Sequence, residues 1–299
     1  MLLALSLLIA QQRAFRSGVD VVRVDVSVTR GRTPVAGLKA ENFALTDNGV
    51  AQDVDSVTLD SLPISVSLVL DVSGSVAGEE LAHLIDAGQR LVRSLRPDDR
   101  ASLITFSHEV LVNVPLTAEV GSVSRALTGL EGSGATSMND AIHVAMNLRP
   151  VDTSRPVIIV FSDGADNLSW SRPADLIDEV KKTAVVIHAI ELRIDSAAAA
   201  RPNSPAFLSQ GYIDRGRDRV PVLEALTLEA GGRVWSAKSS RDLKALFTQA
   251  LEEMRARYLL TYSPKGVPQD GWHTVKVSLK NARGDVTARP GYFVAPRTH

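Results

Sequence analysis

The stretch ISVSLVLDVSGS, residues 64–75, joins a run of apolar residues to an aspartate and two serines. Three later runs are also mostly apolar and of strand length: ASLITFS (101–107), PVIIVFS (156–162) and AVVIHAIEL (184–192). Segments with helical spacing separate these runs. Strands that are apolar on both faces are typical of a parallel sheet covered by helices. The sequence therefore predicts an α/β fold with a doubly wound, mostly parallel sheet.

The helices around this sheet are expected from apolar residues at helical spacing. They are 78–95, which ends before Pro97, then 121–130, 138–148, 173–183, 220–230 and 240–255. Ser137 and Asp140 are spaced like a capping box at the start of the third helix. A weaker interpretation of Asp140 is that it supports the ligands of a metal site without binding the metal itself. Turn chemistry accounts for Asp166 and Asn167.

The two ends of the chain show a different hydrophobic pattern, with a period of two residues. VRVDVSVT (22–29) and HTVKVSLK (273–280) alternate apolar and polar residues, which predicts half-buried strands. Asn48-Gly49 predicts a tight hairpin turn, and further strands are expected at 257–262 and 286–294. Because a few strands need a packed face to be stable, we expect both ends to pair into one small β-sandwich-like domain.

The expected layout has four segments: a leader at 1–17, a β segment at 18–62, the α/β domain at 63–256 and a second β segment at 257–299. The leader follows from MLLALSLLIAQQ, an apolar run that ends at Ala10 and fits a secretory signal. We therefore expect a secreted or periplasmic protein. The run is far shorter than the roughly 20 residues that span a bilayer, so no stable transmembrane anchor is expected.

Composition narrows the function classes. The chain has 299 residues, 44% hydrophobic and 22% charged, and a net charge of −1, which disfavours nucleic acid as a partner. It has no cysteine, which excludes disulfides and thiolate metal sites. The six histidines have no spacing typical of zinc, and the sequence has neither a serine-hydrolase elbow nor a nucleotide-binding P-loop.

In open parallel sheets, ligands bind at the carboxyl ends of the strands. In this sequence, oxygen-bearing side chains stand at these positions. Asp71-x-Ser73-x-Ser75 ends the first apolar run, Asp163 ends PVIIVFS, and Thr136 stands in the glycine-rich turn GSGATS. Hydroxyls and carboxylates suit a hard cation, Mg²⁺ or alternatively Mn²⁺ or Ca²⁺. The sequence predicts that these five residues hold such an ion. The alternative is a vestigial site in which Ser73 and Thr136 only cap helices.

Three segments resemble, in order and spacing, the metal-site loops of von Willebrand factor A domains: DVSGS (71–75), GSGATSMNDAI (132–142) and VIIVFSDGADN (157–167). The resemblance covers about residues 64–255. It implies a MIDAS-type site at which Ser73, Ser75 and Thr136 bind the metal directly, while Asp71 and Asp163 bind directly or through water. It also implies that an Asp or Glu of a protein partner completes the site.

The flanking segments are similar to a bacterial group of secreted von Willebrand factor A related proteins: FRSGVDVVRVDVSV (15–28), LKAENFALTDNG (38–49), RYLLTYSPKG (257–266) and RPGYFV (289–294). From these resemblances we expect a non-catalytic adhesion or scaffolding module. Two alternatives stay open: a hydrolase that uses the same metal, and a structural envelope protein whose β-domain does the binding.

Two segments could set the choice of partner. Both the loop after Asp163, with Trp170, and the stretch 194–219, with Arg215 and Arg217, leave the carboxyl ends of expected strands. Tryptophan and arginine are enriched in interface hot spots, so these three residues are candidates for partner binding. Simple packing of Trp170 and an unstructured arginine-rich loop are the alternatives.

Overall fold

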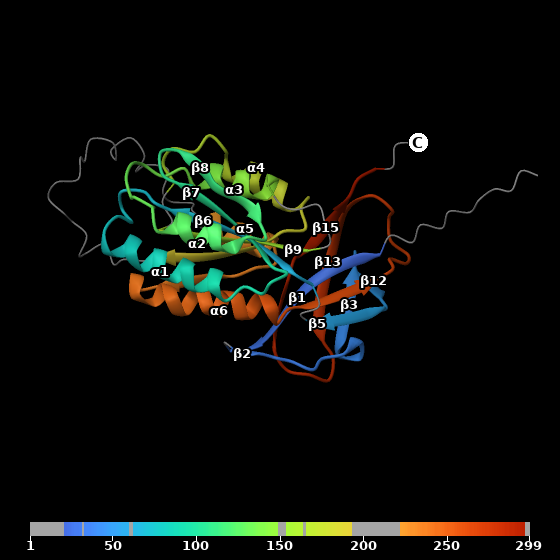
Figure 1. The fold of residues 1–299 in the computed structure, drawn as a ribbon. Helices are drawn as coiled ribbons and strands as arrows, with labels where there is room; N and C mark the ends of the chain where they lie inside the picture. Colours follow the sequence, from blue (N-terminus) through green and yellow to red (C-terminus); the bar gives the residue numbers. More distant parts are fainter. Residues whose placement is uncertain are drawn as a thin grey trace, which may run out of the picture.

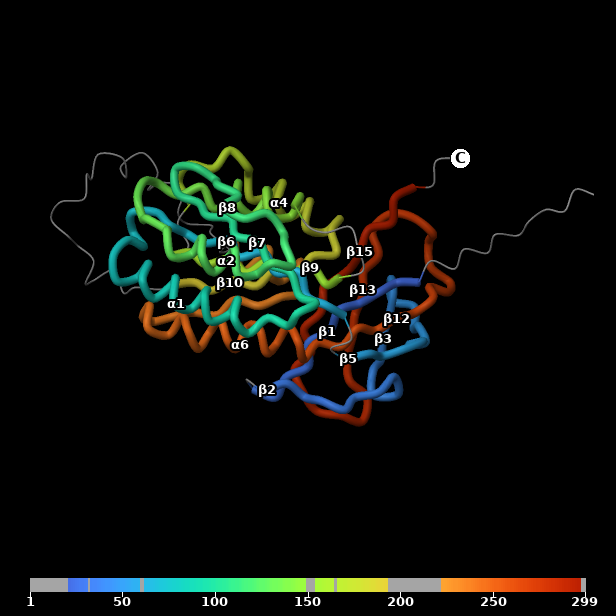
Figure 2. Tube along the Cα trace, in the orientation of Figure 1, coloured from blue at the N-terminus to red at the C-terminus, as the bar shows by residue number. Residues whose placement is uncertain are grey.

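The computed structural model describes residues 21–31, 33–59, 62–148, 154–163, 166–192 and 222–296. Figure 1 shows a sheet covered by helices beside a second unit made of strands. The trace in Figure 2 shows that the blue N-terminal and red C-terminal segments meet in the strand unit, while the middle of the chain forms the helical one. The predicted leader, 1–17, lies outside the described residues.

The large sheet confirms the predicted α/β fold. Its order is β11-β10-β9-β6-β7-β8, parallel except for β8, which pairs antiparallel with β7. Sequence reasoning missed β8 and β11. The strands are β6 (Ile64–Asp71), β7 (Arg100–Phe106), β8 (Val110–Thr117), β9 (Arg155–Ser162), β10 (Val186–Leu192) and β11 (Val234–Ala237).

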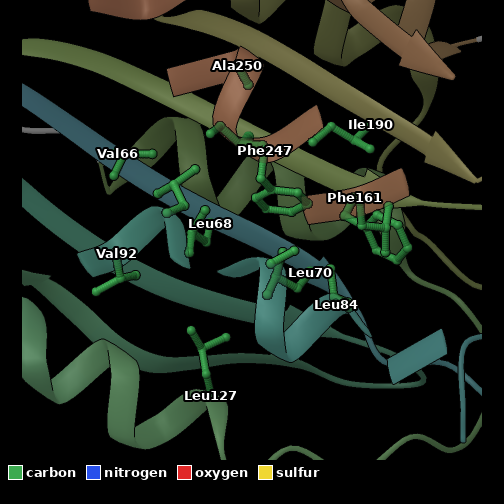
Figure 3. Packing of buried hydrophobic residues seen from close by; sticks show 14 of the residues in the cluster. Val66, Leu68, Leu70, Leu84, Val92, Leu127, Phe161, Ile190, Phe247 and Ala250 are labelled. Atoms are coloured by element: carbon green, nitrogen blue, oxygen red, sulfur yellow. The ribbon is translucent and has the colours of Figure 1, made fainter. Parts of the chain in front are cut away.

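Helices cover both faces of this sheet. On one face lie α1 (Glu79–Arg93), α2 (Val120–Leu127) and α6 (Leu243–Arg255). On the other lie α3 (Met138–Asn147), α4 (Pro173–Val180) and α5 (Val222–Glu229). In Figure 3, Leu68 and Leu70 of β6 lie in one cluster with Leu84 of α1 and Phe247 of α6. Each such fully buried side chain contributes about 1.5–3 kcal/mol.

The strand unit confirms the expected β-sandwich-like domain built from both ends of the chain. One sheet has the order β14-β1-β12-β5 with β2 beside β1, the other β15-β13-β3-β4, and an apolar cluster lies between them. After the short helix η1 (Ala40–Asn42), Asn48 and Gly49 make the expected hairpin turn at φ 46° and 81°. The strands are β1 (Val22–Arg30), β2 (Thr33–Pro34), β3 (Phe43–Asp47), β4 (Val50–Gln52), β5 (Ser56–Leu59), β12 (Tyr258–Tyr262), β13 (Gly271–Leu279), β14 (Asp285–Ala288) and β15 (Gly291–Val294).

The prediction of one strand at 286–294 was wrong. β14 pairs with β1 in one sheet and β15 with β13 in the other, so the chain changes sheets between them. Pro290 has no N–H to continue a ladder. Gly291 passes so close to β13 that a Cβ atom would lie 2.2 Å from the His273 carbonyl oxygen. These two residues make the crossing.

The polar face of β1 is also less exposed than its alternating pattern predicts. Ser27 and Thr29 are buried, and Arg233 of the α/β unit donates a hydrogen bond to the Thr29 hydroxyl at 3.4 Å. Asp25 forms ion pairs with Arg155 at the start of β9 and with Arg257 just after α6. The alternating pattern therefore predicted the strand correctly. It was wrong about the polar face, which contacts the α/β unit instead of solvent.

No helix in the described part of the chain is both long and apolar enough to cross a membrane.

Candidate metal centre

The five predicted ligands lie on loops at the carboxyl edge of the large sheet. β6 and β9 are parallel neighbours, yet the chain leaves β6 toward the α1 face and β9 toward the α4 face. Such a switch point leaves a crevice outside the strand ends. Asp71 is the last residue of β6, and Asp163 directly follows β9.

The loop after β6 folds back on its own carboxylate. Asp71 accepts the backbone N–H of Ser73 on Oδ1 at 2.9 Å, and its Oδ2 accepts the hydroxyl of Ser162 at 2.9 Å. The Oγ atoms of Ser73 and Ser75 lie 3.0 Å apart. Asp71 and Ser73 are buried, whereas Ser75 is exposed. This loop therefore gathers three of the predicted ligands, one of which is open to solvent.

The glycine-rich turn is bonded to this first loop. The N–H of Gly74 donates to the Gly134 carbonyl at 3.0 Å, and the N–H of Ser133 donates to the Val72 carbonyl at 2.9 Å. Gly134 has φ +84°, and a Cβ there would lie 2.3 Å from Nδ1 of His108. Both the backbone angle and the close contact require glycine. The turn places Thr136, which is buried, beside the first loop.

The third loop holds the backbone of Thr136 on both sides. Oδ1 of Asn167 accepts the N–H of Thr136 at 2.9 Å, and the N–H groups of Asn167 and Leu168 donate to its carbonyl at 3.1 Å each. Turn chemistry alone, as expected for Asn167, does not describe this role. Asn167 and Ser162 are site residues that sequence reasoning missed, since neither belongs to a pattern that predicts contact with a distant loop.

The electrostatics around Asp71 favour a bound cation. The pKa of Asp71 is raised to about 6. Burial is the largest cause and the nearby Asp163 carboxylate adds to it, while the hydrogen bonds from Ser73 and Ser162 oppose the rise. No Lys, Arg or His of the described chain forms an ion pair with Asp71. A buried carboxylate is costly without a positive partner. A dication would supply the missing charge.

The types of ligand also fit a hard cation. Within the described ranges, no three His, Cys, Asp or Glu side chains gather as a metal site. Any ion at this edge would thus rest on two carboxylates and the hydroxyls around them, which suits Mg²⁺ or Ca²⁺ better than zinc. The residues present fit the ion that the sequence predicts.

The capping box predicted at the start of α3 was wrong. Ser137 is the N-cap residue, but its side chain makes no capping hydrogen bond. The Asp140 carboxylate instead accepts the backbone N–H groups of Trp170 at 3.0 Å and Ser171 at 2.8 Å. The partner of Asp140 lies 30 residues away, and a local pattern cannot reveal it.

Of the predicted partner-binding residues, the structure describes only Trp170. Its side chain is 94% exposed on the loop between β9 and α4, so simple packing does not account for it. Arg215 and Arg217 lie outside the described residues.

Comparison with known sequences gives a family match over part of the chain. A sequence model of the von Willebrand factor type A domain matches residues 66–165. The inter-alpha-trypsin inhibitor heavy chain H4 of Bos taurus is 28% identical over 138 residues, and heavy chain H2 of Sus scrofa is 30% identical over 121. These matches cover 42% and 36% of this chain but only 15% and 13% of those proteins.

Comparison with solved structures gives the same fold. The von Willebrand factor type A protein from Catenulispora acidiphila superposes with a TM-score of 0.51 at 14% identity, over 87% of this chain and 74% of that one. Proximal thread matrix protein 1 from the mussel byssus has a TM-score of 0.50 at 15% identity, over 65% and 48%. That structure is described with a zinc-occupied MIDAS motif.

Proposed function

Because the chain carries a von Willebrand factor type A domain, we propose that it is a non-catalytic adhesion or scaffolding module that binds another protein through a divalent cation. Its ligands are the five side chains at the switch point: Asp71, Ser73, Ser75, Thr136 and Asp163.

The observation that carries this proposal is the state of Asp71. It is fully buried, close enough to Asp163 for the second carboxylate to raise its pKa, and without an ion pair to a cationic side chain of the described residues. A structural aspartate at such a position would be expected to have an arginine or lysine partner. Two carboxylates balance the charge of a dication, and the hydroxyls add ligands without adding charge.

The proposed ion is Mg²⁺, with Mn²⁺ and Ca²⁺ as alternatives. Mg²⁺ is usually held by few protein carboxylates and keeps several waters. The ion supplies a positive centre that binds an anionic oxygen. The residues of this chain position it: Ser75 lies on the solvent side, while Asp71 and Ser73 lie beneath. An Asp or Glu of the partner would supply that oxygen. In the mussel byssus protein the MIDAS motif is occupied by zinc, so zinc belongs among the ions tested.

Isothermal titration calorimetry on the purified chain tests the metal site. We expect Mg²⁺ and Mn²⁺ to bind the parent, and Asp71→Asn and Ser73→Ala to weaken binding by about tenfold or more, equivalent to about 1.4 kcal/mol. Asp47→Asn and Ser102→Ala are matched controls, because both residues are buried and hydrogen-bonded away from the site. Equal affinity in parent and site variants would refute the proposal.

We further propose that the protein is exported, secreted or periplasmic, as the apolar start at residues 1–10 favours. We also propose the domain limits 18–62, 63–256 and 257–299.

The test of export is to express the full chain in a bacterial host and to analyse the N-terminus of the exported fraction by mass spectrometry. Cleavage close to residue 17 is expected, and retention of the intact chain in the cytoplasm would contradict it.

A further inference from the structure

The loop from Asp166 to Ser171 is bonded to the start of α3. The Asp166 carboxylate accepts the N–H of Asn139 at 2.8 Å and the hydroxyl of Ser169 at 2.8 Å. The Ser169 hydroxyl in turn accepts the N–H of Asp140 at 3.1 Å. Through these contacts the loop satisfies backbone donors in the first turn of α3, which have no partner within the helix.

The next residues of the loop are bonded as firmly. Both oxygens of the Asp140 carboxylate are used, one by the N–H of Trp170 and one by the N–H of Ser171. Hydrogen bonds to a charged acceptor are stronger than neutral ones. The backbone of Trp170 is therefore held in place, although its side chain is not.

This fixed backbone presents an uncovered apolar side chain. Trp170 is 94% exposed and Leu168, two residues earlier, is 47% exposed, whereas Trp235 inside the α/β unit is 7% exposed. Burial of the indole on binding would be favourable, because it would remove a large apolar area from water. No contact within the described chain provides that burial, so a partner would gain it on binding.

The same loop lies beside the proposed metal centre. Its N–H groups at Asn167 and Leu168 hold the carbonyl of the proposed ligand Thr136. Trp170 and the metal ligands are thus parts of one hydrogen-bonded assembly. Because the loop is bonded to the backbone of Thr136, a partner segment at the metal would lie near it.

We propose that Trp170 is the apolar anchor of the partner-binding surface, and that the partner offers a segment with an acidic side chain and an apolar side chain at a fixed separation. This inference rests on the proposed function, because the acidic side chain is the one that the metal binds. Tryptophan is enriched among hot-spot residues. A loop already held in place loses little further conformational entropy on binding.

Selection from a phage-displayed library of random peptides against the immobilised full chain in Mg²⁺ tests the inference. We expect enriched peptides to pair Asp or Glu with an apolar residue at one spacing. In fluorescence polarisation, Trp170→Ala should weaken these peptides by about tenfold or more. Leu228→Ala is the matched control, since Leu228 is 67% exposed at the other end of the sheet, on α5, and its loss should change affinity by less than about twofold.

The outcomes separate the two proposals. Trp170→Ala should bind Mg²⁺ in calorimetry as the parent does, whereas Asp71→Asn should lose both Mg²⁺ and peptide. If the parent binds Mg²⁺ but the peptides bind Trp170→Ala equally well, carry no apolar requirement, or fail to enrich, the Trp170 inference is overturned and the metal stands. If the parent binds no Mg²⁺, the metal proposal fails and the inference fails with it.

Discussion

At the scale of single residues, Asp71 is the side chain on which the two proposals meet. It ends a fully buried strand, and its two oxygens accept hydrogen bonds from Ser73 and Ser162. Those bonds hold the carboxylate in one orientation but do not offset its burial, since its pKa stays raised at about 6. The residue is fixed in position and electrostatically uncompensated, which is the arrangement expected of a ligand and unfavourable for stability.

Asp71 therefore predicts an unusual pH dependence of the metal-free chain. Its pKa rises from 3.8 to about 6 on folding, so the folded state binds more protons between these values, and the free energy of unfolding should fall as pH rises through this window. At pH 7, Asp71→Asn should be more stable than the parent by up to about 3 kcal/mol. Urea unfolding in chelator at a series of pH values measures this.

Addition of Mg²⁺ should reverse the order, because only the parent gains from binding. Asp47→Asn serves as the control for loss of a buried aspartate elsewhere. A parent whose stability between pH 4 and 6 follows that of Asp71→Asn would show that Asp71 ionises freely, and would remove the electrostatic basis of the metal site.

At the scale of elements, the sequence predicted the parts that depend on local pattern. Mostly apolar runs predicted β6, β7, β9 and β10, and helical spacing predicted the six α-helices of the described residues to within a few positions. The edge strand β8, VLVNVPLT, carries Pro115 and leaves Leu111 half exposed, so it lacks the apolar character of its neighbours. Its pairing comes from β7 rather than from its own sequence.

The candidate site divides in the same way. The types and order of Asp71, Ser73 and Ser75 were predictable, because a strand end brings such residues to one edge of the sheet. The roles of Asp140 and Asn167 were not, since each accepts a backbone N–H from a loop about 30 residues distant. A local motif explains such residues equally well as a cap or a turn, and only the folded chain distinguishes these interpretations.

The role of Asp140 in fixing the loop predicts a change in local dynamics. Asp140→Ala removes the acceptor of the Trp170 and Ser171 N–H groups, so amide hydrogen exchange at these two residues should accelerate by about tenfold or more. Exchange in the rest of α3 should stay unchanged. Nuclear magnetic resonance on the labelled chain resolves both regions.

Asp175→Ala is the matched control, because Asp175 is also acidic in a first helical turn but pairs only with exposed Arg172. Burial raises the pKa of Asp140, yet the hydrogen bonds from Ser171 and Trp170 outweigh it and hold that pKa below its usual value. Protection of the loop should therefore persist above the usual aspartate pKa and disappear as pH falls through the lowered one. Unchanged exchange in Asp140→Ala would show that other contacts fix Trp170.

At the scale of the whole molecule, a buried polar network joins the α/β unit to the strand unit. Arg257 lies between α6 and β12, is 1% exposed, and pairs with Asp25 of β1 and with Glu253 of α6. It also donates to the Gly231 carbonyl at 2.7 Å, and Arg155 pairs with Asp25 from β9. Burial raises the pKa of Asp25, but the two arginines outweigh it and hold that pKa below its usual value.

This network predicts that the two units unfold together only while it is intact. Arg257→Leu leaves Glu253 buried without one of its partners and leaves Asp25 with Arg155 alone, so the free energy of unfolding should fall by about 3–5 kcal/mol. Arg241→Leu removes an exposed pair with Glu79 and should cost about 0–1 kcal/mol.

Urea unfolding followed by tryptophan fluorescence measures this. The parent should unfold in one transition and Arg257→Leu in two, with Trp235 and Trp272 reporting the separate units. Because the folded pKa of Asp25 is lowered, the parent's advantage should be present above the usual aspartate pKa and should be lost as pH falls through the lowered value. A single transition of undiminished midpoint in Arg257→Leu would show that apolar packing alone holds the units together, and that Asp25 and its arginines contribute little to their coupling.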